Sequence, residues 1–455
     1  MSFPRYPKYK PSGVEWLGEV PEHWEVKRLR YFASVLRGKF THRPRNDPMF
    51  YDGEFPFVQT GDITGSSRYI TGFKQTLNER GVAVSKEFPK GTLVMAIAAN
   101  IGDVAILDFP AFFPDSIVGL VPMSGIDLNY LYYLMIGMKQ QMLMTATVST
   151  QMNLNVDQIC SLASACPTLP EQTRIVAFLD AETAKIDELV AEQRRLMDLL
   201  KEKRQAVISH AVTKGLNPNA PMKSSGIEWL GEVPEHWEVR RVKSVSSFIT
   251  SGPRGWSERV GEVGSLFVQS GDLNDSLAVE FAGSKRVQVG NDAEATRTLL
   301  CNGDVVVCIT GAKTGNVAIC TTVPEAAYIN QHLCLIRPTQ EILPVFLGIL
   351  LKGKLGQTYF ELSQYGLKQG LSLEDVKEAP VLVPPRVEQV AIVAYLGAES
   401  DRFDTLTAEA QRAIDLLQER RTALISAAVT GQIDLRRLPA RPKRPPMIGK
   451  IAISR

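Results

Sequence analysis

An internal repeat constrains the fold of this chain more than any other feature. The twelve-residue segment EWLGEVPEHWEV at 15–26 returns without change at 228–239, 213 residues later. Three more segments recur in the same order: 57–63 (FVQTGDI) at 267–273 (FVQSGDL), 102–106 at 315–319, and 171–213 at 388–430. A solenoid needs about three repeats to bury a continuous core. Two copies therefore predict a pseudo-dimer of two similar units.

Each unit divides into a mixed part and a helical part. The mixed parts, 1–167 and 216–383, alternate β-rich runs with turn clusters, and their apolar residues recur at helical spacing in 128–144 and 344–362. We expect two similar domains of mixed α/β class.

The helical parts, 168–215 and 384–435, are each predicted to form one long helix. Thr168, Pro170 and Glu171 fit a capping box with proline in the first turn. Forty-odd residues at about 1.5 Å each give a rod of roughly 60 Å, and a helix of that length usually packs on another. The remaining residues, 436–455, form a basic, proline-rich tail whose composition predicts disorder.

Steps of four and three residues along both helices pass through mostly apolar positions, the spacing of a coiled coil. The predicted helix-pair interface is Ile175, Leu179, Ile186, Leu189, Leu196, Leu200, Ile392, Leu396, Phe403, Leu406, Leu417 and Leu424. A pseudo-twofold axis would make the helices antiparallel. One register then sets Glu182 opposite Arg420 and Lys203 opposite Glu399; solvated edges for all four charges are an equal alternative.

Composition excludes several classes of protein. The most apolar stretch, around 93–107, is interrupted by Asn100 and Asp103 and is too short to span a bilayer, so we expect a cytoplasmic protein. The six cysteines include no C-x-x-C pair, which favours small buried side chains over a zinc site. The net charge is only +2, and the tail alone carries seven cations and no acid. If this chain binds DNA tightly, partner subunits supply much of the phosphate contact.

The order of parts resembles the specificity subunit of type I restriction–modification enzymes. The resemblance rests on four features: W-L-G-x-x-P-x-x-W at the start of each half, the helix starts Glu171-Gln172 and Glu388-Gln389, the FVQTGD and FVQSGD segments, and the G-x-V-A-I runs. The resemblance covers nearly the whole chain except the tail. It identifies 1–167 and 216–383 as target-recognition domains and 168–215 and 384–435 as conserved helices.

The resemblance implies a non-catalytic, DNA-binding subunit that reads a split, asymmetric target. Its partners would be two methyltransferase subunits, which methylate adenine with S-adenosylmethionine, and two translocase–nuclease subunits, which use ATP and Mg²⁺. The helices would fix the gap between half-sites. No cofactor or metal is expected in this chain itself.

Base readout needs paired donors and acceptors, with Arg and Lys suited to guanine and Asn and Gln to adenine. Polar turns offer such groups in both domains. The candidate DNA contacts are Lys39, Arg43, Gln59, Thr60, Asn100, Gln151 and Asn153 in the first domain and Arg254, Gln269, Ser270, Lys313, Thr314, Asn316, Lys368 and Gln369 in the second.

These candidates have structural alternatives. An aspartate stands at the same place in both copies, Asp62 in the first and Asp272 in the second. A turn-forming role explains this identity better than the reading of different base sequences. Asn100 differs from its counterpart Lys313, as a reader of sequence should. The loop 37–45 holds four cations and no acid, and is a plausible phosphate clamp or a solvated loop. Trp16, Trp24, Trp229 and Trp237 are expected to anchor the start of each domain.

Two other functions remain open. An enzyme acting on DNA would need an N/D-P-P-Y/F-type or G-x-x-x-x-G-K-[S/T] motif, and neither occurs in the sequence. A coiled-coil scaffold with two protein-binding domains would show no sequence-selective DNA binding.

Overall fold

The structure, a computed structural model, describes residues 3–148, 152–290, 293–364 and 370–437. The chain divides into two compact units: unit 1 is Met1–Gln193 with Arg412–Arg455, and unit 2 is Arg194–Gln411. Each unit therefore contains one mixed domain and one half of each long helix. The predicted boundaries treated the helices as separate segments, whereas packing joins each half-helix to the nearest domain.

Two mixed sheets organise unit 1. One has the strand order β4-β12-β9-β10-β6 and the other β7-β5-β11-β8. Their strands are β4 (Ala33–Arg37), β5 (Tyr51–Phe57), β6 (Tyr69–Ile70), β7 (Gln75–Leu77), β8 (Glu87–Phe88), β9 (Leu93–Ala96), β10 (Val104–Leu107), β11 (Ala111–Phe112) and β12 (Ile117–Pro122). The helices are α1 (Thr60–Thr64), α2 (Glu79–Ala83), α3 (Leu128–Gly137), α4 (Lys139–Thr145) and α5 (Val156–Ser161). Short ladders join β1 (Tyr9–Pro11) to β2 (Glu19–Pro21), β3 (Glu25–Arg28) to β15 (Ala163–Cys166), and β13 (Thr147–Val148) to β14 (Met152–Asn153).

Unit 2 repeats the central strands of this topology and differs at the sheet edges. Its sheets have the orders β19-β26-β23-β24 and β20-β22-β21-β25. The strands are β19 (Ser246–Ser251), β20 (Val260–Gly261), β21 (Ser265–Val268), β22 (Lys285–Val287), β23 (Val305–Cys308), β24 (Val317–Ile319), β25 (Ala327–Ile329) and β26 (Leu333–Pro338). The helices are α7 (Ala293–Thr298), α8 (Pro344–Lys352), α9 (Lys354–Ser363) and α10 (Leu373–Glu378). The ladders β16 (Met222–Ser224) with β17 (Glu232–Pro234) and β18 (Glu238–Arg241) with β27 (Pro380–Val383) match β1-β2 and β3-β15.

The pairing of strands confirms the duplication predicted from the sequence. In unit 1, β12 lies between β4 and β9 and pairs antiparallel with both. In unit 2, β26 pairs in the same way with β19 and β23. The parallel pair β5-β11 has its counterpart in β21-β25.

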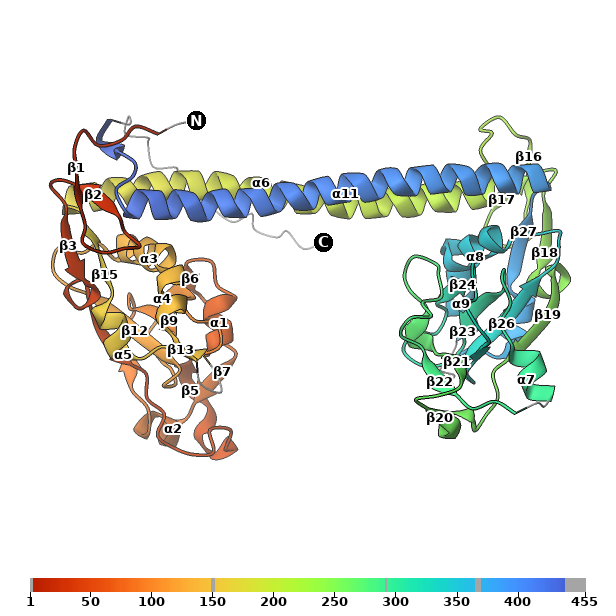
Figure 1. The fold of residues 1–455 in the computed structure, drawn as a ribbon, viewed down its shortest axis with the longest axis horizontal. Helices are drawn as coiled ribbons and strands as arrows, with labels where there is room; N and C mark the ends of the chain where they lie inside the picture. Colours follow the sequence, from red (N-terminus) through yellow and green to blue (C-terminus); the bar gives the residue numbers. More distant parts are fainter. Residues whose placement is uncertain (1–2, 149–151, 291–292, 365–369, 438–455) are drawn as a thin grey trace. The chain divides into compact units, whose positions relative to one another are not determined.

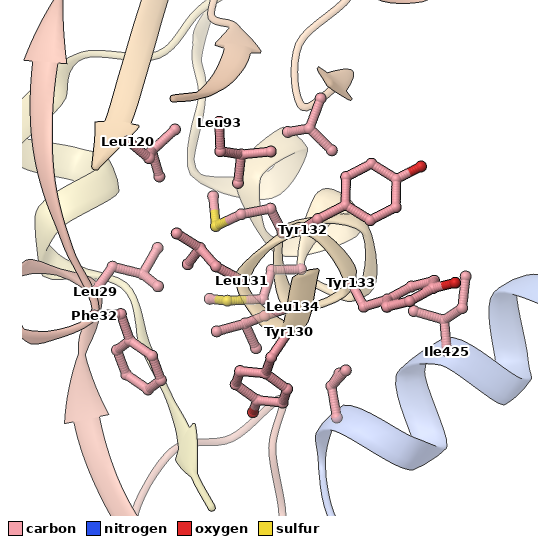
Figure 2. Packing of buried hydrophobic residues seen from close by; sticks show 14 of the residues in the cluster. Leu29, Phe32, Leu93, Leu120, Tyr130, Leu131, Tyr132, Tyr133, Leu134 and Ile425 are labelled. Atoms are coloured by element: carbon pink, nitrogen blue, oxygen red, sulfur yellow. The ribbon is translucent and has the colours of Figure 1, made fainter. Parts of the chain in front are cut away.

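The core of unit 1 is built around α3, which is apolar on all sides because it is covered on all sides. Its residues Tyr130 to Met135 are all buried. Figure 2 shows α3 between Leu93 and Leu120 of the sheet and Ile425 of the second long helix. Helix α8 lies in the same kind of core in unit 2, beside Ile392 and Leu396.

The two long helices, α6 (Leu169–Lys214) and α11 (Arg386–Val429), pair antiparallel within each unit (Figure 1). In unit 1 the start of α6, with Ile175 and Leu179, shares a core with the end of α11, with Leu424 and Ile425. In unit 2 the end of α6 shares a core with the start of α11. Within the described part of the chain, helices with the length and hydrophobicity of a membrane span are absent.

The predicted seam between the helices is correct at its ends and wrong near its middle. Ile175, Leu179, Ile186, Leu200, Ile392, Leu396, Phe403 and Leu424 are buried, and Leu417 is half-buried. Leu189, Leu196 and Leu406, by contrast, are 43%, 43% and 38% exposed.

The error lies in the order of the steps. After Ile186 and Phe403 the structure steps by four and then three, where the prediction stepped by three and then four. The half-buried or buried positions are therefore Val190, Gln193 and Met197 in α6 and Thr407, Ala410 and Ile414 in α11.

Ion pairs between the helices also use other residues than the sequence predicted. Arg421 pairs with Asp187 at 3.3 Å in unit 1, and Arg204 pairs with Asp404 at 2.6 Å in unit 2. Glu182 and Glu399 contact Lys185 and Arg402, three residues ahead in the same helix. The proposed coupling of Glu182 with Arg420 and of Lys203 with Glu399 stays a prediction.

A buried glutamine attaches the start of each long helix to its domain. Gln172 is 1% exposed; its amide nitrogen donates to the carbonyls of Gly125 and Pro167, and its oxygen accepts from the Asp127 N–H at 2.8 Å. Gln389, fully buried, makes the same three bonds with Glu341, Pro384 and Leu343. Each side chain joins the domain, the preceding turn and the helix.

The seam makes a direct prediction about stability. Ile186→Ala should lower the free energy of unfolding by about 2–5 kcal/mol, because it opens a cavity between the helices. Leu189→Ala, three residues away, should change it by roughly 0.5 kcal/mol, because that side chain is largely solvated. Thermal unfolding of the two variants decides; equal losses would restore the seam predicted from the sequence.

The buried glutamine makes a second prediction. Gln172→Leu keeps the side-chain bulk but leaves the buried Asp127 N–H without its acceptor, which should cost about 1–3 kcal/mol. Gln205→Leu, at an exposed position of the same helix, is the matched control and should be nearly neutral. Chemical denaturation measures both; a neutral Gln172→Leu would show that the helix start does not depend on these bonds.

Candidate nucleic-acid interface

The Gln-Thr/Ser-Gly-Asp segments form a helical turn after β5 and after β21. Asp62 accepts a hydrogen bond from the Gln59 N–H at 2.8 Å, and Asp272 accepts one from the Gln269 N–H at the same distance. Both aspartates thus hold the turn, as turn chemistry predicted. Gln59, Thr60, Gln269 and Ser270 are half-buried, and the Gln59 amide donates to Gln75 at 2.8 Å.

In unit 1 this turn lies against two other predicted segments. The Asn100 amide, exposed in the loop after β9, donates to the Thr64 hydroxyl of α1 at 2.9 Å. Asn153 of β14 forms a β-bridge with Ala98 of the same loop. The fold therefore brings Asn100, Asn153 and the turn at Gln59 to one edge of the domain. Gln151, another candidate, lies outside the described residues.

The same three elements meet in unit 2. Asn316, in the loop after β23, donates from its side-chain amide to the Leu273 carbonyl beside the turn at Gln269. The Leu371 N–H donates to the Ile309 carbonyl at the start of that loop. Lys313 is exposed, and Thr314 donates its hydroxyl to the Gly311 carbonyl. Lys368 and Gln369 lie outside the described residues.

Sequence reasoning missed one lysine in each of these edges. Lys139, at the start of α4, pairs with Asp103 at 2.5 Å, and Asp103 also accepts from the Thr64 hydroxyl at 2.7 Å. Lys352, at the end of α8, donates to the Asn274 carbonyl at 2.9 Å and to the Asn316 side chain at 3.3 Å. Burial lowers the pKa of Lys352, with Asp275 acting against that shift and Lys313 adding to it. The sequence did contain one sign of them, because Lys139 and Lys352 stand at the same position of the repeat.

The loop 37–45, here called the cationic loop, is less positive than its sequence suggested. Asp115, far from the loop in the chain, pairs with Arg43 at 3.2 Å and with Arg45. Arg43 also donates to the carbonyls of Phe40 and His42. A phosphate clamp at Arg43 would therefore compete with an existing carboxylate, whereas the Lys39 side chain is exposed.

The cationic loop also borders a cavity of about 220 Å³, which is lined in part by Arg45, Tyr51 and Gln59. In unit 2 the corresponding candidate Arg254 is exposed, and Arg259 stacks on the buried Trp256.

Of the repeated tryptophans, the second in each copy fills the core. Trp24 and Trp237 are buried, whereas Trp16 is half-buried and Trp229 is 37% exposed. The Trp237 indole donates to Glu388 at 3.0 Å. Glu171, its counterpart in unit 1, lies in contact with His23 at 2.9 Å. Burial acts to raise the pKa of Glu171, but hydrogen bonds from His23 and Thr168 hold that pKa below its ordinary value.

The cysteines are less uniformly buried than composition predicted. Cys308, Cys320 and Cys334 are buried, Cys160 and Cys166 are half-buried, and Cys301 is exposed. Within the described ranges no three His, Cys, Asp or Glu side chains are grouped as ligands of a metal ion.

Comparison with known proteins adds the family. The model of the type I restriction modification DNA specificity domain matches twice, at residues 21–195 and 234–415. The chain is 23% identical over 436 residues to the MjaX specificity subunit of Methanocaldococcus jannaschii, covering 92% of this chain and 95% of that one. It is 20% identical over 442 residues to the type I restriction enzyme EcoKI specificity subunit of Escherichia coli K12, covering 91% and 90%.

A solved structure shares the fold. It comes from a structural study of complex assembly and conformational transition of the type I R-M system, and it superposes with a TM-score of 0.65 at 18% identity. The match covers 90% of this chain and 98% of the other. The duplicated family match, over well more than half of the sequence, coincides with the duplicated topology of the two units. This chain belongs to the family of type I restriction–modification specificity subunits, the non-catalytic subunits that recognise the DNA target.

Proposed function

We propose that the two domains read different half-sites of one split, asymmetric DNA target. The main support for this proposal is that the two units share a common framework but have different side chains at its edge. Asp62 and Asp272 hold the same turn in both units. Beside that turn, Asn100 and Asp103 of unit 1 are replaced by Lys313 and Asn316 of unit 2. Similar scaffolds with unlike polar groups suit the reading of unlike base edges.

The charge of the chain supports a need for partners. A net charge of +2 over 455 residues supplies few free cations for the DNA backbone, and Asp115 already occupies Arg43 and Arg45. We propose that two methyltransferase subunits complete the DNA-binding surface and methylate an adenine in each half-site with S-adenosylmethionine. Two translocase–nuclease subunits, using ATP and Mg²⁺, would add cleavage. The complex would act in the cytoplasm.

The long helices would set the distance between half-sites. Helix α6 has 46 residues and α11 has 44, which at about 1.5 Å per residue is a length of roughly 65–70 Å. DNA advances roughly 34 Å per turn, so helices of this length correspond to about two turns. The antiparallel seam, with its alternating steps of four and three residues, keeps the two helices from sliding past each other.

Methylation-aware sequencing of the host genome tests the target. We expect one motif with two unlike halves, a non-specific gap of fixed length and modified adenine in both halves. Deletion of this gene alone should remove the modification, because the methyltransferase subunits then lack their reader. A continuous motif, or a split motif that survives the deletion, would contradict the proposal.

A change in helix length tests the role of the helices. Inserting seven residues after Gln193 and seven after Gln411 adds about 10 Å to each helix and preserves the seam. The preferred gap should lengthen, by up to about three base pairs at roughly 3.4 Å each, while the bases read in each half stay the same. The matched control carries seven conservative substitutions at exposed positions of the same segments. An unchanged gap in the insertion variant would refute the proposal that the helices set the distance between half-sites.

A further inference from the structure

In each unit a lysine, Lys139 or Lys352, meets the loop that follows β9 or β23. The two meeting places are built alike but carry different charges. The Asp103 N–H donates to the Asn100 carbonyl, and the Asn316 N–H donates to the Lys313 carbonyl, which fixes the correspondence of the two loops. Lys139 and Lys352, which stand at the same position of the repeat, reach into these loops from the start of α4 and the end of α8. We call these sets the corner of unit 1 (Thr64, Asn100, Asp103, Lys139) and the corner of unit 2 (Asn274, Lys313, Asn316, Lys352).

In unit 1 the corner is neutral and its groups are bonded to one another. Asp103 forms an ion pair with Lys139 at 2.5 Å and accepts a hydrogen bond from the Thr64 hydroxyl. That hydroxyl in turn accepts a hydrogen bond from the Asn100 amide. The lysine is thereby held by a carboxylate, and the exposed groups of the corner are the neutral Asn100 and Thr64. A phosphate at this place would meet no uncompensated cation.

In unit 2 an amide replaces that carboxylate. Lys352 is held by two neutral oxygens, the Asn274 carbonyl and the Asn316 side chain. Lys313 is exposed in the loop above. Two cations thus face one nearby acid, the exposed Asp275, which also acts on the pKa of Lys352. Counted together with Asp275, the corner of unit 2 carries a net charge of +1, one more than the corner of unit 1.

We infer that the corner of unit 2 binds a DNA phosphate through Lys313 and Lys352, whereas the corner of unit 1 makes no phosphate contact and presents Asn100 as a neutral polar group. The two halves of the target are thus held with unequal dependence on salt. This inference rests on the proposed DNA-reading function and adds to it a difference between the two halves.

Two features make the corner of unit 2 suited to a phosphate. Lys352 is half-buried and held in place by its two bonds, so little side-chain freedom is lost on binding. Lys313 is exposed, and a lysine presents a point charge on a flexible side chain, which contacts phosphate without reading the base. Since Asn316 contacts Lys352 directly, the residue type at position 316 controls how much of that charge is available.

The test measures DNA affinity of the full chain in complex with its methyltransferase subunits at 50 to 200 mM salt. The probes are a duplex carrying the motif found by sequencing and an unrelated duplex of equal length. Lys313→Gln should reduce the slope of log K against log salt by about 0.9, the value of one phosphate contact. The fourfold rise in salt should then cost the variant about 3.5-fold less affinity than it costs the wild type.

Matched substitutions exchange the character of the two corners. Asn316→Asp gives Lys352 a carboxylate, as Asp103 gives Lys139, and should reduce the slope like Lys313→Gln. Asp103→Asn should free Lys139 and increase the slope. Lys377→Gln, which removes a half-buried cation paired with Glu374 in unit 2, is the control and should leave the slope unchanged. Thermal unfolding of each variant confirms that it is folded.

The outcomes separate the inference from the proposed function. If the wild-type complex does not prefer the motif duplex, the DNA-reading function itself fails. If it prefers the motif but Lys313→Gln and Asn316→Asp keep the wild-type slope, the phosphate site is overturned while the function stands. A change of base preference without a change of slope would make Lys313 a base reader and would equally overturn the inference.

Discussion

The fold depends on the sharing of each domain's core with both long helices. Helix α3 is apolar around its whole circumference, a pattern that is stable only where protein covers every face. The sheet covers one side and α11 the other, with Tyr133 and Ile425 in one cluster (Figure 2). Because half-helices complete the cores, neither the domains nor the helices are independent parts. Each unit folds only when two distant segments of the chain meet.

The glutamines at the helix starts extend this dependence to polar groups. A fully buried amide that satisfies two carbonyls and one N–H fixes both the position and the direction of the helix, because any rotation breaks one of the bonds. Gln172 and Gln389 make the same three bonds in the two units. The pair Glu-Gln, noticed as a repeated helix start, is thus explained by packing at the joint between helix and domain.

The sequence predicted the duplication, the mixed domains and the two long helices, because repeats and helical periodicity are local patterns. It placed the middle of the seam wrongly at Leu189, Leu196 and Leu406, because alternating steps of four and three can be taken in either order over a helix with so many leucines. It missed Asp115 beside Arg43, because the two are 72 residues apart and only the fold joins them. Lys139 and Lys352 share a repeat position that the sequence shows, but only the fold shows that they contact the loops after β9 and β23.

The candidate interface shows how one scaffold supports two readings. Groups that hold the scaffold, such as Asp62 and Asp272, bond to backbone atoms and are the same in both units. At each corner the lysine bonds to the side chain of the loop residue, Asp103 or Asn316, so a change at that position alters what the lysine offers. Replacing Asp103 by its counterpart Asn316 leaves the loop in place but changes the partner of the lysine. Divergence of specificity therefore needs no change of fold, since the backbone bond within each loop, from Asp103 N–H to the Asn100 carbonyl and from Asn316 N–H to the Lys313 carbonyl, is the same in both units.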